Sequence, residues 1–108
     1  MSRYLFIQSQ DPYTEARTQA QYELADALAA SGHEVRVLLV QNGVLPARRD
    51  ASCAHFDRLC QSGVSLLADD LSLQQREIGS ADLKPAVKPA PISIVVDAML
   101  AGDKVIWN

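Results

Sequence analysis

Cysteine and aromatic residues are scarce in this sequence. Aromatic residues make up 6% of the 108 positions, and the two cysteines are Cys53 and Cys60. The two cysteines lie seven positions apart in a segment expected to be helical, which separates them by roughly 10 Å along the helix axis. A disulfide cannot span that distance. We therefore expect two reduced thiols, which is typical of a cytoplasmic protein.

Long hydrophobic runs and basic clusters are also missing. The longest apolar segment, Ile92 to Ala101, is interrupted by Asp97 and is shorter than the ~20 residues that cross a bilayer. A first strand is expected almost at Met1, which leaves no room for a signal peptide. The net charge is -3, and basic residues are scattered apart from the pair Arg48-Arg49. We therefore expect no membrane span and no nucleic-acid partner.

The sequence contains no phosphate loop and no closed metal motif. The segment from Ser9 to Thr14 lacks the glycine that would let backbone amides surround a phosphate. Cys53 and His55 are two residues apart, so on a helix their side chains would point about 200° away from each other. The paired spacing of structural zinc sites is absent as well. The residues themselves imply no cofactor and no metal.

Strand-forming and helix-forming segments alternate along the chain. Strands are predicted at 3–9, 34–41, 64–68 and 104–107, with a shorter one near Val87; helices are predicted between Thr14 and Gly32, from about 52 to 60, from 71 to 77 and from 92 to 101. This alternation predicts a parallel sheet with helices on both faces. We expect one domain over residues 1–108, an α/β three-layer sandwich with a mostly parallel sheet of four to five strands in a flavodoxin-like arrangement.

The first predicted helix has a cap and an apolar stripe. Thr14 is placed to cap its first turn. Apolar residues recur at spacings of three and four, which predicts that one face packs on the sheet. The stripe consists of Ala16, Ala20, Leu24, Ala27 and Leu28.

Polar residues gather after the first three predicted strands. Ligands of open α/β sheets bind beyond the carboxyl ends of the strands. The three loops at that edge are 8–14, 41–44 and 69–72. The side chains expected to converge on one ligand-binding cleft are Asp11, Tyr13, Asp69, Asp70, Ser72 and Arg76.

The adjacent carboxylates Asp69 and Asp70 allow two interpretations. Two carboxylates at a strand end could hold a divalent cation, or one could act as a general base. Aspartate is also a preferred residue at the start of a helix. We favour the interpretation in which Asp70 caps a short helix and Asp69 is solvated.

The segment from Gly63 to Ile78, GVSLLADDLSLQQREI, resembles the DsrE/DsrF/TusD family of sulfur-transfer proteins. In that family a strand is followed by a cysteine, a short helix and an Arg-Gly-hydrophobic ending. The run Gly32 to Val35, the turn Asn42-Gly43-Val44 and the closing run Gly102 to Ile106 follow the family in order and spacing. The resemblance covers most of the chain and implies a DsrE-like fold with a pocket.

The resemblance also identifies two departures from the family. Active members carry a persulfide on a cysteine just after the third strand, and placement without gaps puts Asp69 there. A carboxylate cannot attack or hold sulfane sulfur as a thiolate does. Glu77 stands in place of the usual glycine, which puts the local turn in doubt. The resemblance implies a homo-oligomer, a trimer or hexamer, and a sulfur-carrier protein or DsrE-like paralogue as partner. It does not carry over the transfer chemistry.

Three hypotheses about function follow. The first is a non-catalytic DsrE-like binding or assembly subunit linked to intracellular sulfur transfer, which would not be an enzyme. The second is an active sulfurtransferase that uses Cys60 or Cys53, although these thiols share a helix face with Phe56 and are favoured as core residues. The third is a small-ligand or metal-binding domain that uses Asp69 and Asp70. Trp107 and the segment from Ile92 to Met99 are either interface or core.

Overall fold

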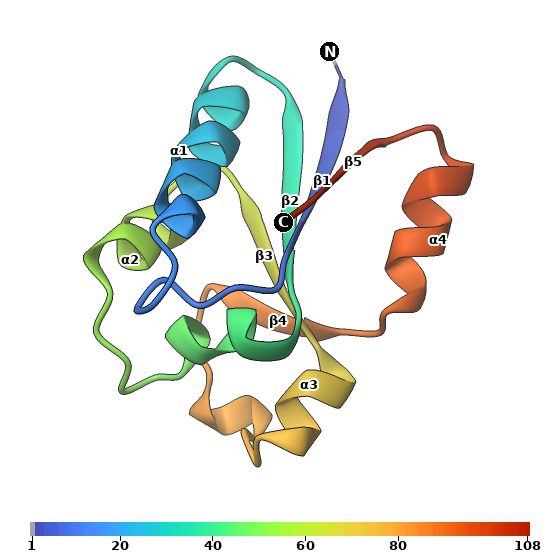
Figure 1. The fold of residues 1–108 in the computed structure, drawn as a ribbon. Helices are drawn as coiled ribbons and strands as arrows, with labels where there is room; N and C mark the ends of the chain where they lie inside the picture. Colours follow the sequence, from blue (N-terminus) through green and yellow to red (C-terminus); the bar gives the residue numbers. More distant parts are fainter. Residues whose placement is uncertain (1) are drawn as a thin grey trace.

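A computed structural model of the protein, which describes residues 2–108, contains a five-stranded, all-parallel sheet (Figure 1). The strands are β1 (Arg3–Gln8), β2 (Glu34–Leu39), β3 (Ser65–Asp69), β4 (Val87–Ala90) and β5 (Lys104–Trp107). Their order across the sheet is β4-β3-β2-β1-β5. The predicted parallel sheet is confirmed, and the short segment near Val87 is a strand of it.

Helices cover the two faces of the sheet unequally. Helices α1 (Arg17–Ala30) and α2 (Ala54–Cys60) lie on one face, and α4 (Ser93–Leu100) lies on the other (Figure 1). Helix α3 (Asp70–Gln75) follows β3 without a loop, and two 3₁₀ segments, η1 (Gln41–Ala47) and η2 (Ser80–Asp82), complete the chain. The predicted three-layer α/β architecture is confirmed. Among residues 2–108, no helix is long and apolar enough to span a membrane.

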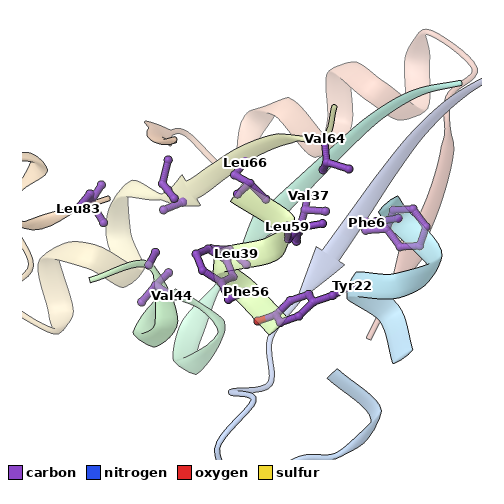
Figure 2. Close-up of a cluster of buried hydrophobic side chains, with 14 of the residues drawn as sticks. Phe6, Tyr22, Val37, Leu39, Val44, Phe56, Leu59, Val64, Leu66 and Leu83 are labelled. Atoms are coloured by element: carbon purple, nitrogen blue, oxygen red, sulfur yellow. The ribbon is translucent and has the colours of Figure 1, made fainter. Parts of the chain in front are cut away.

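Alternation along the strands produces two hydrophobic cores. Successive strand residues point to opposite faces of a sheet. On the first face, side chains of β1, β2 and β3 pack against α1 and α2, as Figure 2 shows for Phe6, Val37, Leu39, Leu66, Tyr22, Phe56 and Leu59. On the second face, Leu5, Ile7 and Leu38 pack against Val95 and Ala98 of α4. Burial on both faces explains why the strands are continuous apolar runs in the sequence.

The stripe predicted on α1 is wrong for most of its members. Ala16, Ala20, Leu24 and Ala27 are exposed, and Leu28 is half-buried. The buried residues of α1 are Thr18, Tyr22 and Ala25. The physical reason is the Tyr22 ring, which packs edge-on against Phe56 with ring centroids 5.7 Å apart. One aromatic ring buries more apolar area than several alanines, so it determines which face of the helix turns inward.

Segment η1 packs closely against the end of β1. A Cβ atom at Gly43 would lie 2.1 Å from the carbonyl oxygen of Gln8, so only glycine fits there. The backbone amide of Val40 donates to the same carbonyl at 3.0 Å. The sequence predicted a turn at Asn42-Gly43 followed by a loop, and the structure has a seven-residue 3₁₀ helix instead.

Candidate functional site

Asp69 is the last residue of β3 and the N-cap of α3. Its Oδ2 atom accepts hydrogen bonds from the backbone amide of Ser72 at 3.0 Å and from the Ser72 hydroxyl at 2.7 Å. The residue is only 7% exposed. The expectation that Asp70 caps this helix and that Asp69 is solvated is therefore wrong. Because β3 runs directly into α3, the last strand residue is the one with the extended backbone that an N-cap requires.

Ser72 links this cap to η1. Its hydroxyl donates to Asp69 and accepts a hydrogen bond from the backbone amide of Gln41 at 2.8 Å. Ser72 is buried, so each of these polar groups depends on the others for a partner. The chain of hydrogen bonds joins the carboxyl end of β3, the first turn of α3 and the start of η1.

Arg76 lies at the other end of α3 and extends the same group. Its Nη1 atom donates to the Ser72 carbonyl oxygen at 3.2 Å, and its Nη2 atom donates to Asn42 Oδ1 at 3.1 Å. The structure therefore brings Asp69, Ser72 and Arg76 together through hydrogen bonds, and their binding of a ligand stays a prediction. Asp70 lies beside them but is exposed.

Asp11 and Tyr13 belong to a different environment. Asp11 Oδ1 accepts from the backbone amides of Tyr13 at 2.9 Å and Thr14 at 3.0 Å, and Oδ2 accepts from the Thr14 hydroxyl at 2.9 Å. Thr14 is thus part of a turn and does not cap α1, which begins at Arg17 with no side-chain cap. Within residues 2–108, no hydrogen bond or ion pair joins Asp11 or Tyr13 to Asp69.

The surroundings of Tyr22 show where that first loop lies. Burial raises the pKa of Tyr22 well above its usual range, and the neighbouring Cys53, Tyr13, Cys60 and Asp11 raise it further. Asp11 and Tyr13 therefore lie on the side of α1 and α2. Segment η1 contacts both the end of β1 and α3, and in Figure 1 it lies between this loop and α3.

A metal site at the two adjacent carboxylates has little support. Over the described part of the chain, no group of three or more His, Cys, Asp or Glu side chains is arranged to hold a metal ion. Asp69 uses its carboxylate for the cap, while Asp70 points to solvent. This arrangement favours a structural role for Asp69.

The two cysteines lie at opposite ends of α2. Cys53 precedes the helix, Cys60 is its last residue, and both are half-buried against the core on the α1 and α2 face. Burial raises the pKa of Cys60, with Lys84 partly opposing the shift. A raised pKa leaves less thiolate at neutral pH, and thiolate is the nucleophilic form. The predicted packing role therefore fits Cys60 better than a reactive one.

Sequence reasoning missed a buried polar group at the end of β1. Gln8 is fully buried, and its Oε1 atom accepts from the backbone amide of Gln10 at 3.0 Å and from Asn108 Nδ2 at 3.4 Å. Its Nε2 atom donates to Gln21 of α1. A polar residue at the end of an otherwise apolar strand was the signal that could have found this group.

Comparisons with known proteins agree with this fold. The model of the DsrE/DsrF-like family matches residues 2–107, and no match is found among curated proteins. The ychN protein from E. coli has a similar structure, with a TM-score of 0.86 at 19% identity and 100% of each chain covered. MTH1491, a protein of unknown function from Methanobacterium thermoautotrophicum, gives a TM-score of 0.84 at 21% identity, again with both chains covered completely. At these identities the two structures show a shared fold.

Proposed function

Since the chain belongs to the DsrE/DsrF-like family, we propose that it is a non-catalytic binding or assembly subunit linked to intracellular sulfur transfer. The observation that carries this proposal is Asp69. It stands at the carboxyl end of β3, where the resemblance places the sulfur-bearing cysteine of an active member. The carboxylate there is buried and serves as the cap of α3.

The chemistry of sulfur transfer explains why this substitution matters. A persulfide forms when a thiolate attacks the sulfane sulfur of a donor persulfide, the donor's sulfur–sulfur bond breaks, and the donor leaves as a thiolate. A carboxylate is a poor nucleophile toward sulfur. It also has no sulfur atom of its own with which to form the sulfur–sulfur bond of a persulfide. The remaining thiols are half-buried on α2, and Cys60 has a raised pKa. These features together support a subunit that binds or organises other components.

The outer side of α4 supports the assembly part of the proposal. Four of its apolar residues are between 52% and 83% exposed: Ile92, Val96, Met99 and Leu100. On the same segment Val95 and Ala98 are buried against the sheet. The segment therefore combines core residues with apolar residues that are exposed to solvent. Contiguous apolar surface of this kind is typical of interaction sites. We propose a homo-oligomer, a trimer or hexamer, that uses this surface.

Three measurements test the proposal. Sedimentation velocity is expected to show a trimer or hexamer, and a strict monomer would contradict the assembly role. A turnover assay with a low-molecular-weight persulfide donor and a thiol acceptor is expected to stay at the background rate. A rate above background that disappears in Cys60→Ser or Cys53→Ser would favour the active sulfurtransferase instead. Stable association with a sulfur-carrier protein or a DsrE-like paralogue is the expected positive result.

A further inference from the structure

A cavity of about 450 Å³ opens beside the end of α3, and we call it the arginine cavity. One wall is the loop that follows η1, and the other is the segment from the end of α3 to η2. Its charged lining residues are Arg48, Arg49, Asp50, Arg76, Glu77 and Asp82. The volume lies within the range typical of small-molecule sites in proteins.

The three arginines of this cavity have no acidic partner. Among residues 2–108, the arginines with a carboxylate oxygen within 4.0 Å are Arg3, Arg17 and Arg36, and none of them lines the arginine cavity. Arg48, Arg49 and Arg76 therefore line one hollow, and within residues 2–108 no carboxylate neutralises their charge. A guanidinium group matches the geometry of carboxylate and phosphate oxygens.

Two of these arginines are already positioned by uncharged acceptors. Arg76 donates to the Ser72 carbonyl and to Asn42 Oδ1. Arg48 Nε donates to the Leu45 carbonyl oxygen at 2.8 Å. These contacts hold the side chains without neutralising their charge. Ordering before binding reduces the entropy that a ligand must offset.

The loop that carries Arg48 and Arg49 is held on both sides. The backbone amide of Arg49 donates to the Asp82 carbonyl at 2.6 Å, which joins the loop to η2. Lys84 Nζ donates to the carbonyl oxygens of Pro46 at 2.9 Å and Ala51 at 2.8 Å, and its side chain is largely buried. The two walls of the arginine cavity are therefore linked to each other.

The carboxylates of the cavity restrict what it can bind. Asp50, Glu77 and Asp82 are all exposed, and Asp82 Oδ2 accepts a hydrogen bond from the backbone amide of Gly79 at 3.1 Å. Three positive and three negative side chains line the same hollow. A polyanion would be repelled by the acidic groups, but a small molecule with one oxyanion and nearby hydroxyl groups would satisfy both signs.

We propose that the arginine cavity binds a small hydroxylated metabolite through a single oxyanion group. The oxyanion, a phosphomonoester or a carboxylate, would accept hydrogen bonds from Arg48, Arg49 and Arg76. The hydroxyl groups would donate to Asp50 or Glu77. This proposal does not depend on the non-catalytic role proposed above.

Titration of amide chemical shifts tests the site with defined probes. Glycerol 3-phosphate and glycerate represent the two oxyanion sources and are added at constant ionic strength, with sodium chloride as the blank. At least one of them is expected to cause saturable shifts at the backbone amides of residues 48–51 and 76–82. Arg49→Gln is expected to raise the Kd at least about tenfold, which corresponds to about 1.4 kcal/mol, because the variant loses a charged hydrogen bond to the oxyanion.

Arg58→Gln is the matched control. Arg58 is also exposed and without a carboxylate partner among residues 2–108, but it lies on α2 beside Tyr22, outside the arginine cavity. Its Kd is expected to equal that of the wild type. The proposal is overturned if neither probe causes amide shifts beyond those caused by sodium chloride. It is also overturned if Arg58→Gln weakens binding as much as Arg49→Gln does.

Discussion

Asp69 and Tyr22 are both buried polar residues, and they differ in whether the fold gives them a partner. Asp69 accepts two hydrogen bonds from Ser72. The Tyr22 hydroxyl has no hydrogen-bond partner among residues 2–108. A buried polar group without a partner costs free energy, whereas a satisfied one stabilises its surroundings. Removing the polar group at each of the two positions should therefore change the stability of the fold in opposite directions.

Asp69→Ala is expected to lower the free energy of unfolding by about 1–3 kcal/mol. The variant loses the N-cap of α3 and leaves the buried groups of Ser72 without their acceptor. Asp70→Ala is the control, because Asp70 is exposed and its loss should change stability by about 0.5 kcal/mol or less. Urea unfolding measures both. A larger cost at Asp70 would show that the cap has been assigned to the wrong residue.

Tyr22→Phe is expected to reduce the loss of stability at alkaline pH. Burial raises the pKa of Tyr22, so the folded state keeps its proton where the unfolded chain, with a pKa near 10, has lost it. The contribution of Tyr22 to the free energy of unfolding is therefore fully present below about pH 10. Above that pH it falls by up to about 1.4 kcal/mol per pH unit.

Urea unfolding between pH 8 and pH 11 checks this prediction. Equal slopes for the wild type and Tyr22→Phe would contradict the account of Tyr22.

At the scale of helices and strands, the sequence predicts most of the features that depend on a local pattern of residues. The sequence places the strands to within about a residue or two, and it does so most directly for β1, β2 and β3, whose apolar runs are mostly buried. Asp69, Ser72 and Arg76 were predicted to meet because they follow one strand. The position of Asp11 could not be predicted in this way. Segment η1 packs on the end of β1 through a contact between Gly43 and Gln8 that is distant in sequence, so no local pattern places Asp11 relative to Asp69.

The end of α3 gives a prediction at the same scale. Glu77 has a φ of 54°, a left-handed conformation that suits glycine, and the amide of Ile78 donates to the Leu73 carbonyl at 2.9 Å around it. The family's usual glycine would fit this turn without strain. Glu77→Gly is therefore expected to raise the free energy of unfolding by roughly 1 kcal/mol.

Glu77→Ala separates backbone strain from the loss of charge. It removes the carboxylate but keeps Cβ, so it should give none of the gain expected for glycine. Thermal and urea unfolding measure both variants. Equal stabilities for Glu77→Gly and Glu77→Ala would mean that the left-handed backbone at Glu77 is not strained.

The whole molecule presents an uneven surface. Two helices and their aromatic residues close one face of the sheet, while α4 alone lies on the other and keeps an apolar outer side (Figure 1). Trp107 at the end of the edge strand β5 is 65% exposed. Apolar patterning cannot separate such residues from core residues, because the alternative depends on whether a second chain is present. This is why the segment from Ile92 to Met99 left both interpretations open.

Charge placed on α4 is expected to disrupt the proposed oligomer. Val96→Glu and Leu100→Glu each put a carboxylate on the exposed side of the helix, and burying it in an interface would cost several kcal/mol. The average mass in sedimentation velocity should fall toward that of the monomer. Leu71→Glu is the matched control: Leu71 is 59% exposed, as Met99 is, but lies on α3. If both α4 variants form the same oligomer as the wild type, the interface lies elsewhere on the molecule.

We propose that this chain does not carry sulfur, because a carboxylate stands where the resemblance places the thiolate of an active member. Incubation of the wild-type protein with a persulfide donor, followed by intact-protein and peptide mass spectrometry, tests it most directly. We predict no gain of one sulfur atom on Cys53 or Cys60, under conditions that load a cysteine-bearing family member. A stable added sulfur atom on either residue would contradict the account.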